Sequence, residues 1–247
     1  MNRYELAASN LGYIIPKTCT FVNPFFAKKL SFFRKLERPP VLWYNHIKYK
    51  HSGDAMEQIL FVNACPREGS RTLELARHLL AGLEGQVEEL PIFEENLLPL
   101  NGKTLALRDK MTAAGNFDHP IFKYARQFAA ADTVVIAAPF WDLSFPSALK
   151  IWLEYVMALG VTFRYDEKGF PCGLCKANRL YYVSTAGGPV LPSHMGFDYV
   201  DALAKNYFGI GETACFSAQL LDVVGADVET ILAQARQEID DYRRKTV

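Results

Sequence analysis

Hydrophobic residues along this chain gather in five short runs, and the segments between the runs repeat apolar positions at helical spacing. The runs are bounded by turn residues and are too short for typical helices, which favours strands. They cover residues 58–64, 87–92, 133–138, 180–184 and 214–220. The helical spacing covers residues 72–83, 121–131, 146–159, 197–207 and 228–243. Strand and helix alternating five times predict a doubly wound α/β fold, a five-stranded parallel sheet with helices on both faces.

Two parts of the chain lie outside this alternation. Residues 93–116 are polar and contain Pro99, and we expect a long irregular excursion there. Residues 1–55 carry ten aromatic residues interleaved with basic ones. One interpretation of this stretch is a segment that touches a membrane surface or a partner. We favour the other, in which residues 1–55 are an N-terminal extension outside the fold and residues 56–247 form the domain.

Composition excludes some classes of protein. The 247 residues include 27 Lys and Arg and 27 Asp and Glu, so the zero net charge gives no nucleic-acid footprint. Residues 1–55 hold nine basic and three acidic residues, which places +6 there and −6 on the remainder. No apolar run is long enough to span a membrane. Five cysteines, an odd number, favour a reducing compartment over a disulfide framework, and we expect the cytoplasm.

The third strand leads into a loop that is suited to binding a flat ligand. This loop consists of Pro139, Phe140, Trp141, Asp142 and Leu143. It ends where Pro146 suits the first turn of the next helix. Open α/β sheets bind ligands at the carboxyl ends of their strands. Two large aromatic rings beside free backbone donors and acceptors favour a flat heterocycle with polar edges.

The loop after the first strand, residues 65–72 (CPREGSRT), predicts a phosphate site. Gly, Ser and Thr at the entrance to a helix offer free N–H groups and hydroxyls, and the helix dipole adds positive potential. A plain N-cap at Ser70 or Thr72 would explain the same residues. Because an aromatic loop follows the third strand, we favour the phosphate interpretation.

The same loop supports an alternative enzyme class. Cys65 and Arg71 have the C-x5-R spacing of low-molecular-weight tyrosine phosphatases and related arsenate reductases, in which a Cys thiolate attacks phosphorus. Two features oppose this alternative. Glu68 would place a carboxylate in the cradle, and the sequence has no Asp-Pro pair to serve as the late general acid of the phosphatases.

A third loop follows the fourth strand, with the sequence STAGG over residues 184–188. Its candidate ligand-binding residues are Thr185, Ala186, Gly187 and Gly188. Two adjacent glycines allow a close approach of the backbone to a ligand, although Gly-Gly-Pro is also a common turn.

The loop after the third strand, its helix and the segment GVTFRY over 160–165 resemble the flavodoxin-like FMN-dependent NAD(P)H:quinone oxidoreductases, most closely the NADH-dependent azoreductases. The resemblance covers roughly Met56 to the C-terminus. It agrees with the strand order 2-1-3-4-5 that right-handed crossovers around one nucleotide site suggest. It implies that Ser70, Arg71 and Thr72 hold the FMN phosphate, and that the flavin ring lies between residues 140–143 and 185–188.

The resemblance also implies NADH or NADPH as co-substrate, a quinone or azo compound as acceptor, and a homodimer whose sites include the partner chain. The chemistry would be carried by FMN, with no catalytic side chain and no metal. Three positions depart from the family pattern. Cys65 stands where relatives often have Ser, Asp142 where they commonly have Asn, and Ala186 where azoreductases usually have Arg.

Two smaller hypotheses remain. Cys172 and Cys175 form a CxxC motif that could be a redox pair or half a zinc site, but no second pair has matching spacing, and we expect ordinary thiols. A non-enzymatic alternative is an electron-carrying flavodoxin. Those carriers are typically strongly acidic, and this chain is not.

Overall fold

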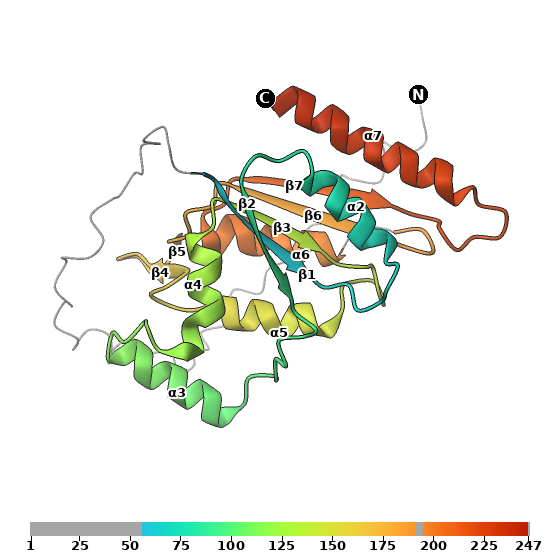
Figure 1. The fold of residues 1–247 in the computed structure, drawn as a ribbon. Coiled ribbons are helices and arrows are strands. Elements are labelled where there is room, and N and C mark those ends of the chain that lie inside the picture. The colour runs from blue at the N-terminus through green and yellow to red at the C-terminus, as the bar shows by residue number, and fades with distance from the viewer. Residues whose placement is uncertain (1–55, 191–194, 247) are drawn as a thin grey trace, which may run out of the picture. The chain divides into compact units, whose positions relative to one another are not determined.

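The computed structural model describes residues 56–190 and 195–246, and within them it shows a parallel sheet with helices on both sides (Figure 1). The order of the five strands is β2-β1-β3-β6-β7. Their bounds are β1 Gln58–Asn63, β2 Gln86–Pro91, β3 Thr133–Ala137, β6 Arg179–Thr185 and β7 Glu212–Ala218. The helices are α2 Arg71–Leu80, α3 Gly102–Ala113, α4 Lys123–Ala130, α5 Ser147–Val156, α6 Met195–Leu203 and α7 Val228–Thr246. This sheet has the predicted order 2-1-3-4-5, counted along its own strands.

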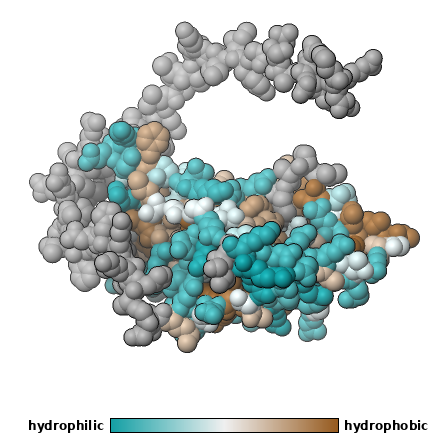
Figure 2. Space-filling model, turned by 90° about the horizontal axis from the view of Figure 1, so that it is seen from above, coloured by the Kyte–Doolittle hydropathy of each residue, from teal (hydrophilic) through white to brown (hydrophobic). Residues whose placement is uncertain are grey.

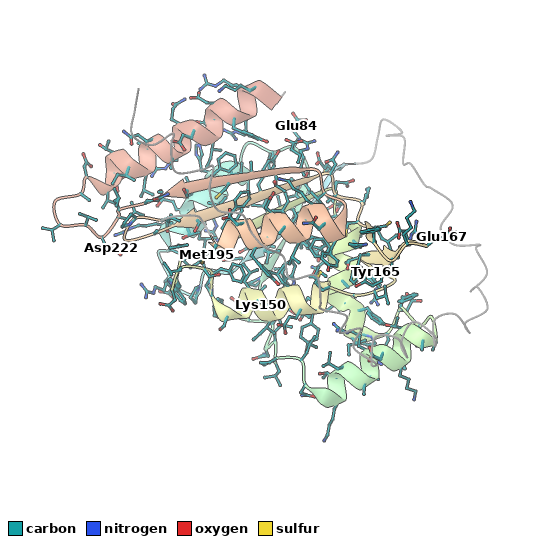
Figure 3. The ribbon with its side chains drawn as sticks, turned by 180° about the vertical axis from the view of Figure 1, so that it is seen from behind. Glu84, Lys150, Tyr165, Glu167, Met195 and Asp222 are labelled. Atoms are coloured by element: carbon teal, nitrogen blue, oxygen red, sulfur yellow. The ribbon has the colours of Figure 1, made fainter. Side chains whose placement is uncertain are left out.

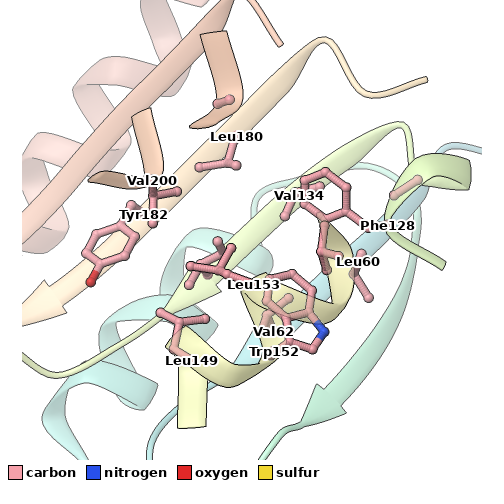
Figure 4. Close-up of a cluster of buried hydrophobic side chains, with 14 of the residues drawn as sticks. Leu60, Val62, Phe128, Val134, Leu149, Trp152, Leu153, Leu180, Tyr182 and Val200 are labelled. Atoms are coloured by element: carbon pink, nitrogen blue, oxygen red, sulfur yellow. The ribbon is translucent and has the colours of Figure 1, made fainter. Parts of the chain in front are cut away.

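Each face of the sheet buries its own hydrophobic core. Alternate residues of the central strands point to opposite faces, so Val134 and Ile136 pack with α4, α5 and α6, whereas Val135 packs with α2 and α7. Figure 4 shows the first of these cores, with Trp152 and Leu153 of α5 against Val62 and Val134. Every residue of β3 is buried, which explains why that strand reads as a continuous apolar run.

The register of the sheet brings the ends of three strands together. Asn63 of β1 pairs with Ala137 of β3, and Ala137 pairs with Val183 of β6. Because all three strands are parallel, the loops that follow them leave the sheet at the same edge. The candidate residues of these loops, far apart in the sequence, therefore meet at one place.

The prediction of an irregular excursion over residues 93–116 is wrong, because α3 lies within it. Its N-terminus is a capping box in which the Asn101 side chain accepts hydrogen bonds from the backbone of Lys103 and Thr104, while the Thr104 hydroxyl accepts from the Asn101 backbone. No residue of α3 is buried. A helix with no core-facing side has no hydrophobic periodicity, and that is the signal on which the prediction depended.

The structure adds a small antiparallel hairpin after α5. Strands β4 (Phe163–Tyr165) and β5 (Pro171–Gly173) pair across the turn between them. In this turn the Asp166 carboxylate accepts hydrogen bonds from the backbone of Lys168 and Phe170. The predicted helix over 197–207 is α6 followed by one π-helical turn, η2 (Ala204–Phe208), which Gly209 ends at φ +77°.

The side of the molecule seen from above is mainly hydrophilic, as expected where the amphipathic helix α7 covers the sheet (Figure 2). None of the helices that the structure describes is long and apolar enough to cross a membrane. Residues 1–55, and with them the two interpretations of that segment, lie outside the described residues.

Candidate functional site

Backbone hydrogen bonds hold three of the candidate loops side by side at the carboxyl edge of the sheet. The Ala64 N–H donates to the Ala137 carbonyl at 2.8 Å, just beyond the ends of β1 and β3. The Phe140 N–H donates to the Thr185 carbonyl at 3.0 Å, which joins the loop after β3 to the end of β6. The three loops predicted from the sequence therefore form one continuous surface.

The loop after β1 delivers unpaired N–H groups to this surface. Gly69 adopts a left-handed conformation at φ +66°, and Ser70 caps α2 by accepting a hydrogen bond from the Leu73 N–H at 3.3 Å. The backbone N–H groups of Arg71 and Thr72 have no acceptor among the described residues. Free N–H groups at the positive end of a helix dipole form a site for an anion such as a phosphate.

A direct contact between two side chains ties the first loop to the third. The hydroxyl oxygens of Thr72 and Thr185 lie 2.6 Å apart, and the Thr72 side chain is buried. Thr72 was expected to contact a ligand. Its hydroxyl instead joins α2 to the end of β6, which leaves its backbone N–H as the group that can face an anion.

The loop after β3 forms a tight turn at its tip. The N–H of Ser144 donates to the carbonyl of Trp141 at 2.8 Å, and the residues between them, Asp142 and Leu143, have φ of +50° and +68°. Positive φ at both central positions defines a type I′ turn, which is usually made with Gly or Asn. The N–H groups of Asp142 and Leu143 have no acceptor among the described residues, and Trp141 is exposed.

Arg67 is a site residue that the sequence analysis missed. Its guanidinium carbon lies 5.6 Å from the centre of the Trp141 ring, in a cation–π contact between the loops after β1 and β3. The signal was an Arg inside the loop predicted to bind phosphate. Only the fold shows that the aromatic residue of the other loop lies beside it.

The loop after β7 is the second missed component. Its Asp222 donates from the backbone to the Gly187 carbonyl at 3.0 Å, and its carboxylate accepts from Arg71 at 2.9 Å. A Cβ atom on Gly187 would lie 2.3 Å from this carboxylate, so Gly187 is needed for the close approach. At Gly188 a Cβ would meet nothing. Asp222 could have been flagged as a charged residue just beyond the fifth strand.

The environment of Cys65 does not support the phosphatase alternative. Burial raises the pKa of Cys65 to about 11, with a smaller contribution from the negative charge of Glu89. Its sulfur lies 3.7 Å from the Ala137 carbonyl oxygen. A phosphatase nucleophile must be a thiolate at neutral pH, which requires a lowered pKa.

The CxxC cysteines have separate surroundings. Cys172 lies on β5, whereas the thiol of Cys175 donates to the Thr162 carbonyl at 3.5 Å, and burial raises the pKa of Cys175 to about 12. Both thiols are free. The part of the chain that the structure describes contains no cluster of three or more residues able to hold a metal ion.

Comparisons with known proteins agree with this architecture. A family model described as "Flavodoxin-like fold" matches residues 57–242. An FMN-dependent NADH:quinone oxidoreductase of Coprothermobacter proteolyticus is 33% identical in an alignment of 205 positions that covers 77% of this chain and 100% of that protein. FMN-dependent NADH:quinone oxidoreductase 2 of Clostridium acetobutylicum is 35% identical in an alignment of 202 positions that likewise covers 77% of this chain and 100% of that protein.

Solved structures show the same fold. The azoreductase of Bacillus anthracis strain Sterne superposes with a TM-score of 0.68 at 23% identity, covering 77% of this chain and 100% of that one. The FMN-dependent NADH-azoreductase of Bacillus anthracis strain Ames Ancestor, solved in complex with FMN, gives 0.65 at 21% identity, covering 77% and 99%. Together with the family model and the relatives above 30% identity, they establish that this chain belongs to the flavodoxin-like family of FMN-dependent NADH:quinone oxidoreductases.

Proposed function

We propose that this protein is an FMN-dependent oxidoreductase that passes electrons from NADH to a quinone or an azo compound. One observation carries the proposal: a helix N-terminus with free N–H groups and an aromatic turn with free N–H groups lie at one edge of the sheet. Two chemically different recognition surfaces side by side suit a molecule with a phosphate at one end and a flat polar heterocycle at the other. The names of the relatives supply the identity of that molecule.

The residues present fit the phosphate of FMN. The N–H groups of Arg71 and Thr72 would donate hydrogen bonds to the dianion, since the Ser70 cap accepts from Leu73 and leaves them without an acceptor among the described residues. Gly69 supplies the left-handed backbone conformation, φ +66°, with which the loop leads into α2. Cys65, the departure from Ser, contributes no charge here because its raised pKa of about 11 keeps the thiol neutral at physiological pH.

The residues also fit a flat ring. The turn at Asp142 and Leu143 presents two free N–H groups toward acceptor atoms on the edge of a heterocycle, and Trp141 beside them supplies a partly exposed aromatic surface. Gly187 lets the loop after β7 approach closely, since a Cβ there would lie 2.3 Å from the Asp222 carboxylate. Bound FMN supplies the two-electron transfer, and the protein contributes orientation rather than a catalytic acid or base.

The compartment is part of the same proposal. The four cysteines of the described residues, Cys65, Cys172, Cys175 and Cys215, are all free, and thiols in this state are stable in a reducing environment. We therefore place the enzyme in the cytoplasm, where NADH is present to serve as its co-substrate.

Steady-state kinetics test the proposed function. If NADH and the acceptor use the same site in turn, varying one against the other gives parallel lines in double-reciprocal plots. Purified protein should contain flavin that leaves as FMN on denaturation. Protein that contains no flavin, takes up none, and does not oxidise NADH in the presence of a quinone would contradict the proposal.

We further propose that the protein is a homodimer, as its family resemblance implies. Helix α3 buries none of its side chains, and Leu98, Leu105 and Leu107 on and before it are exposed. A groove of about 440 Å³ beside it is lined by α3, α5, α6 and η2. Apolar surface left open in this way favours contact with another chain. A second copy is the occupant that we propose.

Sedimentation velocity on charged variants tests the dimer. Leu105→Asp places a charge in the groove and should shift the protein towards the monomer, because an unpaired buried charge is costly in an interface. Val224→Asp is the matched control, since Val224 is a fully exposed apolar residue on the loop between β7 and α7. A wild-type monomer, or equal behaviour of both variants, would contradict the proposed surface.

A further inference from the structure

The loop after β7 reaches across the site to the first residue of α2. Nη1 of Arg71 donates to a carboxylate oxygen of Asp222 at 2.9 Å, and it lies 3.5 Å from the Leu221 carbonyl oxygen. Both contacts use the same nitrogen. The guanidinium has five N–H donors in a planar fork. Its Nε and Nη2 groups therefore remain without an acceptor among the described residues.

The backbone of Asp222 is itself held in place by the neighbouring loop. The N–H groups of Leu220, Leu221 and Asp222 donate to the carbonyls of Gly188, Ala186 and Gly187 at 3.2, 3.2 and 3.0 Å. Three successive bonds lock this segment onto the loop after β6. Figure 3 shows Asp222 at one end of the sheet and Tyr165 and Glu167 of the β4–β5 hairpin at the other. The end with Asp222 is the edge where the candidate loops meet.

From this geometry we propose that Asp222 is a positioning residue for the phosphate site. By accepting from Nη1, it orients the guanidinium of Arg71 so that Nε and Nη2 address a phosphate at the N-terminus of α2. The inference rests on the proposed function, because the phosphate is that of FMN. It adds a fourth loop to the three that the sequence indicated, and it assigns Arg71 a partner.

The arrangement explains why an acidic residue stands near an anion site. A carboxylate repels a phosphate, so its charge alone would weaken binding. An Arg side chain loses conformational entropy when it is fixed, and a neighbour that holds it beforehand lowers this cost at the moment of binding. The relevant property of Asp222 is thus its hydrogen-bond acceptor, which Asn also possesses.

The pair is not needed for folding. The side chains of Arg71 and Asp222 are 42% and 71% exposed, and ion pairs this exposed contribute little to stability. Substitutions at either position should give folded protein. Effects on ligand binding can therefore be separated from effects on the fold.

Binding of FMN and of riboflavin to the apoprotein tests the proposal, with flavin fluorescence as the readout. Riboflavin lacks the phosphate and serves as the matched ligand. We expect Asp222→Ala to weaken FMN binding about three- to fivefold, the size of an exposed charged pair, and to leave riboflavin binding unchanged. Asp222→Asn keeps an acceptor and should retain wild-type affinity or exceed it. Glu229→Ala, which removes an exposed acid with no contact to Arg71, should have no effect.

A double variant completes the test. In an Arg71→Gln background, which itself should bind FMN more weakly, Asp222→Ala should cause no further loss, because Asp222 acts only through Arg71. If Asp222→Ala leaves FMN affinity unchanged, or weakens FMN and riboflavin equally, the inference is wrong. If wild-type protein binds FMN no better than riboflavin, or binds neither, the proposed function fails instead.

Discussion

Two residues at the site adopt backbone conformations that are uncommon for their residue types. Leu143 has φ +68° and Asp142 has φ +50° in the turn after β3. Asp tolerates the left-handed region, but a Leu there is strained. Strained residues of this kind concentrate at functional sites, where the surrounding structure holds them in place. At Leu143 the strain keeps an exposed N–H group at the tip of the aromatic turn.

Replacing Leu143 should reveal this strain. A left-handed conformation costs an L-residue about 1–2 kcal/mol, and Gly loses roughly 0.5–1 kcal/mol more chain entropy on folding. We therefore expect Leu143→Gly to raise the free energy of unfolding by up to ~1 kcal/mol in urea denaturation. Leu143→Ala keeps a Cβ and should give no gain. A Gly variant less stable than the Ala variant would show that the Leu conformation is unstrained.

The thiol of Cys65 should be unreactive in the folded protein. Its pKa of about 11 lies above the ordinary value, so the neutral thiol persists at pH 8 and the thiolate is only about one molecule in a thousand. Site-resolved mass spectrometry after alkylation should show Cys65 modified slowly at pH 8 and faster as the pH rises through 10. Rapid modification at pH 7 would mean a lowered pKa, and the phosphatase alternative would regain support.

Some site residues could be identified from sequence and others could not. Ser70 could be predicted as an N-cap, because a cap and the helix that it caps are adjacent in the sequence. Asp222 contacts Arg71 and Arg67 contacts Trp141, and these partners lie 151 and 74 residues away in the sequence. Spacing along one chain carries no signal for such contacts. The packing of four loops at one edge of the sheet creates them.

At the scale of elements, hydrophobic patterning succeeded wherever an element faces the core. β3 is buried on both faces, and its run of apolar residues was sufficient to place it. α3 has no buried residue, so only its capping box marked it. β4 and β5 have three residues each, too few for alternation to be recognised.

The hairpin and the π turn meet through their backbones, which makes Gly173 a sensitive position. A Cβ there would lie 2.2 Å from the carbonyl carbon of Phe208, a backbone atom that cannot move aside alone. We expect Gly173→Ala to lower the free energy of unfolding by about 1–3 kcal/mol, as overpacking does. The measurement is urea denaturation followed by circular dichroism.

Gly102 is the matched control, because a Cβ there meets nothing within 4 Å and the residue begins α3. Gly102→Ala should be neutral or stabilise the protein by up to ~1 kcal/mol, since Ala loses less chain entropy than Gly. If both variants lose the same free energy of unfolding, the loss in Gly173→Ala does not come from the contact between β5 and η2.

At the scale of the whole molecule, the sequence predicted the strand order because five strands and right-handed crossovers leave few topologies. That order alone does not specify chemistry, since doubly wound sheets serve many functions. The proposed chemistry rests instead on a combination of features: a helix N-terminus with free N–H groups and an aromatic type I′ turn lie on adjacent loops of one edge. Asp222 extends that edge to a fourth loop.

Anaerobic addition of NADH to the purified protein, followed by visible absorbance, tests the central claim most directly. The account predicts a yellow flavin spectrum that bleaches with about one equivalent of NADH, because FMN takes two electrons, and that returns when a quinone is added. Protein that stays colourless after incubation with FMN, or a bound flavin that NADH does not bleach, would contradict it.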